Sequence, residues 1–153
     1  MKAVEHNIHA TAISVGGTGL VFVGPSGSGK SALAFDCLAE ARFLGLAAGL
    51  VGDDRLVISA ADGRVVARGP LPIRGMIELR YSGIVSIAHV SEAELKYAVR
   101  TVAANESERL PANDEHYTLA DGIELPLIRV PPWSRFPLSL ILARTGLLDQ
   151  IGR

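Results

Sequence analysis

The feature that most constrains the fold of this chain is the octapeptide at residues 24 to 31, which reads Gly-Pro-Ser-Gly-Ser-Gly-Lys-Ser. It matches the pattern Gly-x-x-x-x-Gly-Lys-Ser, in which the backbone N–H groups of a loop turn inward around a phosphate group. The mechanism requires a buried strand before the loop and a helix after it, because the helix N-terminus adds partial positive charge. The octapeptide therefore predicts a strand–loop–helix unit at this point of the chain.

The flanking sequence meets this requirement. Leu20–Val23 is a short apolar run typical of a buried strand, and the segment from Lys30 to about Leu44 has apolar residues at helical spacing. We expect Lys30 to reach the β- and γ-phosphates of a nucleotide and Ser31 to ligate Mg²⁺. The alternative is a glycine–serine turn that binds nothing, and the flanking strand and helix argue against it. The predicted phosphate-binding residues are Gly24, Pro25, Ser26, Gly27, Ser28, Gly29, Lys30 and Ser31.

The rest of the chain is rich in predicted strands. Asp62-Gly63 and Asp121-Gly122 each separate two apolar-rich runs, which is a strong hairpin signal. Leu95–Val102 alternates in hydropathy and favours a strand, although Ser91 and Glu94 before it resemble a helix capping box. Residues 136–149 are leucine-rich and predict a closing helix. With so few helices, we expect a mixed α/β domain with much antiparallel pairing. The further expected strands cover residues 11–15, 47–51, 55–60, 64–68, 76–79, 84–88, 117–120 and 123–129.

Composition limits the function classes. The chain has 153 residues, which suits a single domain over residues 1–153, and 48% of them are hydrophobic. Its formal net charge is −1, so no excess of basic residues exists to bind nucleic acid. No apolar stretch reads as a signal peptide or a membrane span, and the single cysteine cannot form an internal disulfide. We therefore expect a cytoplasmic protein that binds neither nucleic acid nor membranes, with part of its apolar surplus in an oligomer interface.

Two adjacent carboxylates, Asp53 and Asp54, follow the apolar run at residues 48 to 51. A carboxylate at the end of a buried strand beside a phosphate-binding loop is suited to Mg²⁺ coordination. Adjacent side chains on an extended chain point to opposite sides, so we expect one to act on the metal and the other as a base. The alternative is a solvated Asp-Asp turn.

The short separation of Lys30 and Asp53 along the sequence narrows the choice of protein family. Together with the octapeptide, three segments make the sequence resemble the catalytic domain of the HPr kinase/phosphorylase family. They are Ile8-His-Ala-Thr-Ala, Leu50-Val-Gly-Asp-Asp-Arg-Leu and Ile77-Glu-Leu-Arg-Tyr-Ser-Gly-Ile. The resemblance covers roughly residues 8 to 145 and implies the short form of the family, which lacks the N-terminal domain.

The resemblance implies a fold like the nucleotide-binding core of phosphoenolpyruvate carboxykinase. It also implies an ATP- and Mg²⁺-dependent kinase that phosphorylates a serine of the phosphocarrier protein HPr in the sugar phosphotransferase system. Members of the family also dephosphorylate HPr by phosphorolysis and are commonly hexamers, so we expect HPr as partner and a homo-oligomer.

The resemblance implies a role for each matching residue. Asp53 corresponds to the catalytic base, Asp54 to a support of the metal and Glu78 to a Mg²⁺-contacting glutamate that joins Ser31. His9 corresponds to a histidine that assists near Asp53, although its residue type alone fits an exposed N-terminal histidine. Arg80 corresponds to the arginine of the family signature. Arg135 corresponds to an arginine in the basic loop before the last helix, although it also fits an ordinary surface arginine.

Two positions depart from the family pattern, since Ala10 and Tyr81 stand where the family has glycine. They leave open a second class of function, in which the chain senses a nucleotide and transfers little phosphate. A small-molecule kinase is a weaker third possibility, because no arginine-rich lid segment is present and the loop around residues 105–115 is acidic.

Overall fold

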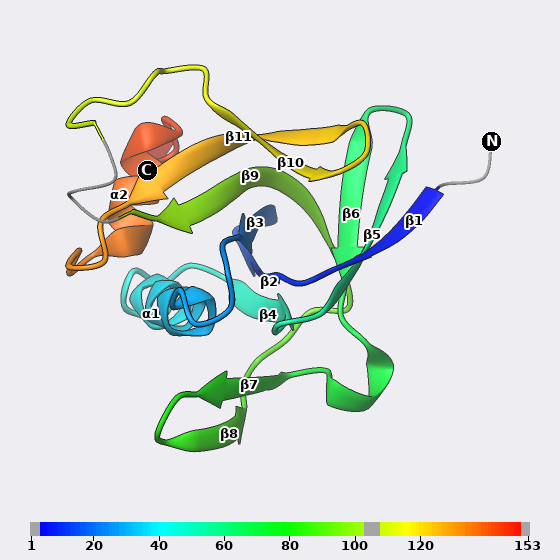
Figure 1. Ribbon diagram of the computed structural model, residues 1–153. Coiled ribbons are helices and arrows are strands. Elements are labelled where there is room, and N and C mark those ends of the chain that lie inside the picture. The colour runs from blue at the N-terminus through cyan, green and yellow to red at the C-terminus, as the bar shows by residue number, and fades with distance from the viewer. Residues whose placement is uncertain (1–3, 103–107, 151–153) are drawn as a thin grey trace.

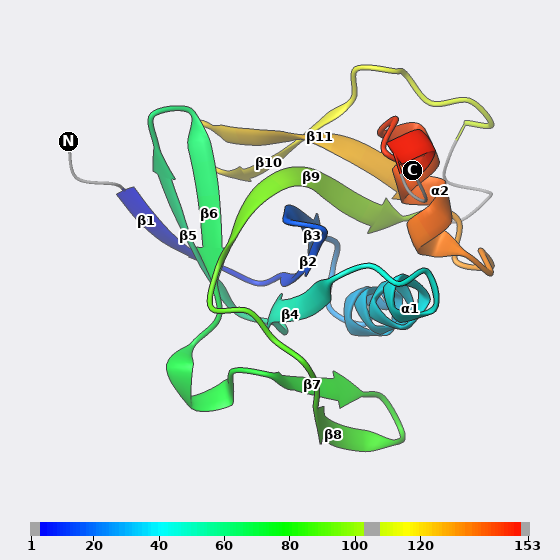
Figure 2. The same cartoon turned by 180° about the vertical axis from the view of Figure 1, so that it is seen from behind.

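The computed structural model describes residues 4–102 and 108–150. Most of its strands belong to one mixed sheet, and β7 and β8 form a separate hairpin that projects from the rest (Figures 1 and 2). The elements are β1 (Val4–Ile8), β2 (Thr11–Val15), β3 (Thr18–Phe22), α1 (Lys30–Phe43), β4 (Ala48–Gly52), β5 (Leu56–Ala61), β6 (Arg64–Arg68), a 3₁₀ turn (Leu71–Ile73), β7 (Met76–Leu79), β8 (Gly83–Ser86), β9 (Ala93–Thr101), β10 (His116–Ala120), β11 (Ile123–Val130), α2 (Pro137–Arg144) and a second 3₁₀ turn (Leu148–Gln150).

Strand β9 joins the parts of the sheet. Its first residues pair antiparallel with β6, and its later residues pair parallel with β3 on one side and β11 on the other. The strand order is β1-β5-β6-β9-β3-β2-β4, with β10 and β11 branching from β9. The sequence prediction of a mixed α/β fold is therefore confirmed.

Alternation along the central strands divides the core in two. Ile13, Leu20 and Phe22 face a cluster that includes α1 and α2. Ala12 and Val21, at the intervening positions, face a second cluster with residues of β5, β6 and the β10–β11 hairpin. Both faces of β2 and β3 are thus covered, which fixes the strand that leads into the phosphate-binding loop.

Most predicted elements agree with the structure, including α1 and the two Asp-Gly hairpins. The predicted strand at Leu95–Val102 is present as β9, which ends at Thr101, and the segment does not form a helix. Strand β1 was not predicted, and β3 covers Thr18–Phe22 where the sequence predicted a strand at Leu20–Val23. Of the predicted loop at residues 105–115, residues 105–107 lie outside the described residues, and 108–115 form neither helix nor strand.

The predicted closing helix over residues 136–149 is wrong in its length. Helix α2 ends at Arg144, and Gly146 adopts a φ of 77°. The N–H of Leu147 donates to the carbonyl of Leu142, so the chain turns back on the helix end. A left-handed glycine stops the helix although the leucine pattern continues beyond it.

A buried carboxylate holds the two helices together. Glu40 of α1 accepts hydrogen bonds from the backbone N–H groups of Leu138 (2.9 Å) and Ser139 (2.7 Å) and from the Ser139 hydroxyl. The N-cap residue of α2, Phe136, provides no side-chain acceptor of its own. Glu40 therefore caps α2 from the neighbouring helix and satisfies N–H groups that would otherwise lack partners. Among the described residues, no helix is long and apolar enough to cross a membrane.

We predict that Glu40→Ala destabilises the protein by about 3 kcal/mol, because buried donors of α2 lose a charged acceptor. The measurement is the free energy of unfolding in urea. Asp36→Ala is the matched control, since Asp36 is an exposed carboxylate on the same helix. The control should change stability by less than about 0.5 kcal/mol. Equal losses in the two variants would contradict the capping role.

Candidate active site

The loop between β3 and α1 has the backbone conformation of a phosphate-binding loop. Gly24, Gly27 and Gly29 have φ values of 137°, 80° and 90°, a region that side-chain-bearing residues rarely adopt. Helix α1 begins at Lys30, and the N–H of Leu33 donates to the carbonyl of Gly29 at 2.9 Å. The predicted strand–loop–helix unit is thus present, with the N-terminus of α1 at its end.

The loop carries a positive charge and a polar group that suit the binding of an anion. The Lys30 ammonium donates to the carbonyls of Gly24 (3.0 Å) and Pro25 (3.1 Å) and has no ion pair among the described residues. Ser28 Oγ is buried without a hydrogen-bond partner in the described part of the chain. These features fit a phosphate group, because a cation without a counter-ion lies across a glycine-rich loop.

Asp53 ties three elements to this loop. Its Oδ1 accepts hydrogen bonds from the Ser31 hydroxyl (2.5 Å) and the Thr11 hydroxyl (2.9 Å), and its Oδ2 accepts one from the Glu78 backbone N–H (3.0 Å). The donors come from the start of α1, the start of β2 and β7. The carboxylate is therefore fixed beside the last residue of the phosphate-binding loop.

Thr11 is the residue that sequence reasoning missed as a functional residue. Its side chain is fully buried, and its hydroxyl both donates to Asp53 and accepts from the backbone N–H of Asp54 at 3.2 Å. A buried threonine at the start of an apolar strand was the available signal, since a buried hydroxyl needs a partner. Thr11 holds the Asp53 side chain and the Asp54 backbone in one arrangement.

The premise that Asp53 and Asp54 lie on an extended chain is wrong. Asp54 has a φ of 64°, so the chain turns immediately after β4, and the Asp54 side chain is exposed. Asp53, Asp54 and Glu78 nevertheless line the same cavity of about 170 Å³, whose other lining residues are Arg55, Ile73, Met76 and Ile84. Three predicted carboxylates thus surround one space beside Ser31.

These oxygen groups fit a magnesium ion. Mg²⁺ prefers oxygen ligands and is usually bound by one or two carboxylates, substrate phosphates and water. The Ser31 hydroxyl and the Asp53 carboxylate are the types of donor required, and they are in contact. No group of three His, Cys, Asp or Glu side chains among the described residues has the geometry to hold a metal ion alone.

The structure places the other predicted residues differently. The Arg80 guanidinium lies over Gly27, with its nearest nitrogen 3.7 Å from where a Cβ on Gly27 would stand. His9 and Arg135 are exposed, and no hydrogen bond or ion pair joins either to the site within the described residues. Tyr81, which replaces a family glycine, is fully exposed and has a φ of 68°. This conformation favours glycine, which explains the residue found in the family.

Comparison with known proteins identifies the family of this chain. The sequence model of the family "HPr Serine kinase C-terminal domain" matches residues 2–135. The chain belongs to this family. It is 30% identical over 115 residues to the HPr kinase/phosphorylase of Clostridium beijerinckii, covering 75% of this chain and 34% of that protein. It is 27% identical over 139 residues to the HPr kinase/phosphorylase of Clostridium perfringens, covering 84% of this chain and 43% of that protein.

The HPr kinase fold is also present. The solved structure of the Hpr(Ser) kinase/phosphatase from Coxiella burnetii superposes with a TM-score of 0.74 at 22% sequence identity, covering 96% of this chain and 99% of that one. The chain spans less than half the length of the two curated relatives from Clostridium. The predicted family and fold are confirmed.

We predict that Thr11→Val increases hydrogen exchange at the backbone N–H groups of Asp54 and Glu78 by about fivefold, because one hydrogen bond is worth about 1 kcal/mol. The Asp54 group loses its acceptor directly, and the Glu78 group loses a fixed acceptor on Asp53. NMR-detected exchange measures both. Thr11→Ser retains the hydroxyl and should behave like the wild type. Unchanged protection of both N–H groups in Thr11→Val would contradict the positioning role of Thr11.

Proposed function

We propose that this chain is a Mg²⁺- and ATP-dependent protein kinase that phosphorylates a serine of the phosphocarrier protein HPr. The observation that supports it best is the 2.5 Å hydrogen bond from Ser31 to Asp53. This contact joins a phosphate-binding loop to a fixed carboxylate, which nucleotide binding alone does not require. The family model and the names of the relatives support HPr as acceptor.

The residues of the loop would bind the phosphates. Backbone N–H groups of the loop, other than at Pro25, which has none, and the N-terminus of α1 would face the phosphates, and Lys30 would leave its two carbonyl partners for the β- and γ-phosphates. Ser31, with Glu78 and Asp54 nearby, would hold Mg²⁺ and its water ligands, which leaves Asp53 to act on the acceptor. Bound there, the ion would offset charge on the transferred phosphoryl group.

Asp53 would act on the acceptor. Its Oδ1 already accepts two hydrogen bonds, whereas Oδ2 accepts one from Glu78 and retains a lone pair. The serine hydroxyl of HPr would donate to this oxygen from the 170 Å³ cavity. As the serine oxygen bonds to the γ-phosphorus and ADP leaves, the proton passes to Asp53.

The same carboxylate would serve the reverse direction. In phosphorolysis, inorganic phosphate attacks the phosphoserine, the bond to the serine oxygen breaks, and pyrophosphate forms. Asp53 would then return the proton to the serine oxygen. Arg80 over Gly27 supports this proposal, because a guanidinium beside the loop is suited to an additional phosphate group.

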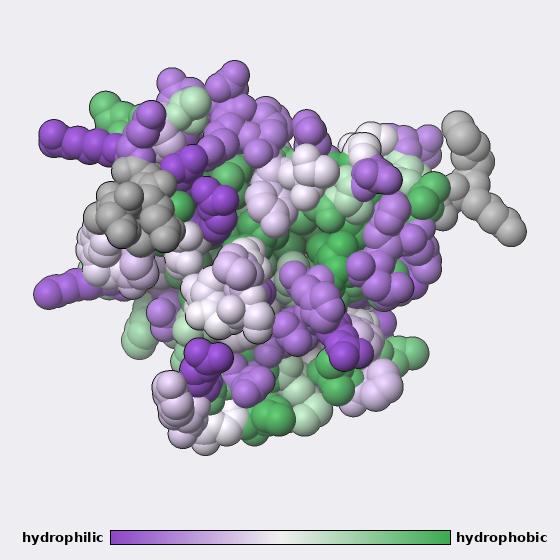
Figure 3. All heavy atoms as spheres, in the orientation of Figure 1, coloured by the Kyte–Doolittle hydropathy of each residue, from purple (hydrophilic) through white to green (hydrophobic). Residues whose placement is uncertain are grey.

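Homo-oligomerisation in the cytoplasm belongs to the same proposal. The β7–β8 hairpin projects from the main sheet and carries exposed apolar side chains that do not line the acidic cavity, among them Tyr81 in its turn (100% exposed) and Val85 (36%). Figure 3 shows apolar groups at the lower end of the molecule, where this hairpin lies. An isolated hairpin is only marginally stable, which favours its coverage by another copy of the chain.

The test is transfer of labelled phosphate from ATP to HPr in the presence of Mg²⁺. Wild-type protein should label HPr, and an HPr variant whose acceptor serine is alanine should remain unlabelled. Asp53→Asn should lower the rate by about 10²- to 10⁴-fold while ATP still binds, because only the proton acceptor is lost. Asp121→Asn, in the exposed β10–β11 turn, is the matched control and should retain full activity.

Three results would count against the proposal. Full activity of Asp53→Asn would contradict the role of that carboxylate. ATP binding without any labelling of HPr, beside an active control enzyme, would favour the nucleotide-sensing alternative. The reverse reaction predicts that labelled HPr loses its label and that pyrophosphate is released when inorganic phosphate is added. If no pyrophosphate is released, the reverse reaction is contradicted.

A further inference from the structure

The directions of three parallel strands indicate at which edge of the sheet a ligand would bind. Strands β3, β9 and β11 run parallel, so their carboxyl ends, at Phe22, Thr101 and Val130, lie at the same edge. Ligands of parallel sheets bind outside these ends. The phosphate-binding loop follows β3, and the segments after β9 and β11 are its neighbours.

Hydrogen bonds connect these segments. The Thr101 hydroxyl donates to the carbonyl of Ser28 in the loop at 3.1 Å. The N–H of Val102 donates to the carbonyl of Val130 at 3.1 Å. The end of β9, Val102 and the end of β11 are therefore held beside the phosphate-binding loop.

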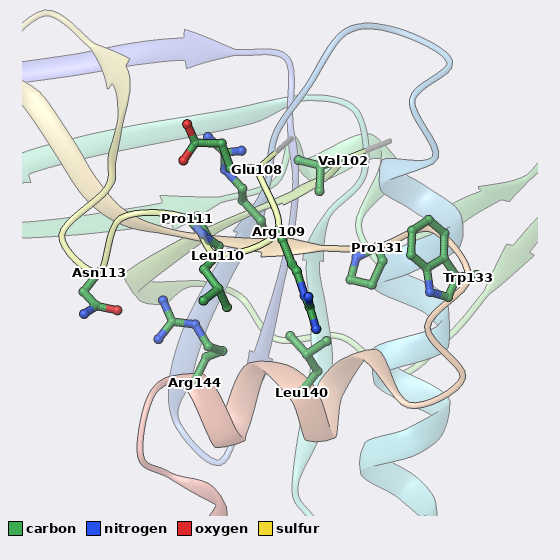
Figure 4. Close-up of a pocket in the computed structure, with 11 residues that line it drawn as sticks. Val102, Glu108, Arg109, Leu110, Pro111, Asn113, Pro131, Trp133, Leu140 and Arg144 are labelled. Carbon is green, nitrogen blue, oxygen red and sulfur yellow. The ribbon is translucent and has the colours of Figure 1, made fainter. Parts of the chain in front are cut away.

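A cavity of about 810 Å³ opens among these residues. Figure 4 shows that its side chains come from α2, from the segment after β9 and from the segment after β11. The volume lies within the usual range for small-molecule sites of about 300–1,000 Å³. Its apolar lining includes Val102, Leu110, Pro131, Trp133 and Leu140.

Three arginines and one acidic residue, Glu108, give this lining its charge. Arg129 donates to Glu115 through two nitrogens, at 2.7 and 2.5 Å, and the Arg129 guanidinium holds the pKa of Glu115 below its usual value. Arg109 and Arg144 form no ion pair within the described residues (Figure 4). Flat guanidinium groups, an indole ring and aliphatic side chains together suit an aromatic heterocycle, which stacks on flat groups and accepts hydrogen bonds at its ring nitrogens.

The position of Asp53 fixes which end of a nucleotide this cavity faces. In the sheet order β9-β3-β2-β4, the loop follows β3, the acidic cavity lies after β4, and the larger cavity lies on the β9 side. Phosphoryl transfer places the attacking and leaving oxygens roughly in line, on opposite sides of the phosphorus. An acceptor beside Asp53 therefore requires the rest of the nucleotide to extend toward β9 and β11.

We propose that the 810 Å³ cavity binds the nucleoside part of the nucleotide whose phosphates occupy the loop. This inference rests on the nucleotide binding in the proposed function and assigns the base and ribose to residues after β9, after β11 and on α2. Trp133 offers a ring, 65% exposed, for the base to stack on. The site is separate from the carboxylates that act on the acceptor.

Trp133 is the single tryptophan of the chain, so its fluorescence reports on this cavity alone. The experiment titrates the full chain with Mg-ATP and, separately, with Mg-tripolyphosphate, which has phosphates but no nucleoside. Calorimetry follows the binding of both. We expect both to bind, ATP to change the Trp133 emission, tripolyphosphate to leave it unchanged, and excess tripolyphosphate to reverse the change.

Variants provide the second measurement. Trp133→Ala should weaken ATP about tenfold, as expected for loss of base stacking, and leave the affinity for tripolyphosphate unchanged. Trp133→Phe retains a ring and should stay within about threefold of the wild type. Phe43→Ala removes another exposed aromatic ring, one that does not line the cavity, and should change neither affinity.

Each contrary outcome has a distinct meaning. An equal change of emission with tripolyphosphate, or an unchanged ATP affinity in Trp133→Ala, would overturn the nucleoside site while phosphate binding at the loop stands. Failure of both ligands to bind would overturn the nucleoside site together with the nucleotide half of the proposed function. Binding as predicted, without transfer to HPr, would support the nucleoside site and contradict only the kinase proposal.

Discussion

The Asp53 carboxylate is the interaction on which the arrangement of the site depends. Hydrogen bonds from Ser31, Thr11 and the Glu78 backbone bring α1, β2 and β7 to one point. A half-buried carboxylate loses part of its hydration, and three donors compensate for that loss. Without them, the turn after β4 would have no fixed relation to the phosphate-binding loop.

The topology explains how two segments 22 residues apart meet. Strands β3 and β4 both pair antiparallel with β2, so they run in the same direction and end at the same edge. Helix α1 returns the chain across the sheet between them, and Glu40 anchors this helix to α2. The phosphate-binding loop and the acidic turn therefore lie at one edge, with the nucleoside cavity on the far side of the loop.

Sequence reasoning predicted the parts whose local signals are strong. The glycine pattern at residues 24–29 requires unusual φ values, and Asp-Gly pairs favour tight hairpins, so the loop, α1 and both hairpins were predictable. Strand β1 was missed because Val4 and Ile8 enclose the polar residues Glu5, His6 and Asn7, and pairing with β5 decides its structure.

The features that could not be predicted from the sequence depend on contacts between residues that are distant in the chain. The hydroxyl of Thr11 gains its role only because β2 and the end of β4 lie side by side, and the left-handed turn at Asp54 depends on that contact. The larger cavity combines residues of two regions that are distant in the sequence, 102–113 and 129–144. The length of α2 was overestimated because leucines continue beyond the left-handed Gly146.

The most direct test of this account is a crystal structure of the protein with Mg²⁺ and a non-hydrolysable ATP analogue. The account predicts phosphates in the loop beside Lys30, the metal at Ser31, the γ-phosphate facing Asp53, and the base in the cavity with Trp133. A nucleotide that lies with its base beside Asp53, or with its phosphates away from the loop, would contradict it.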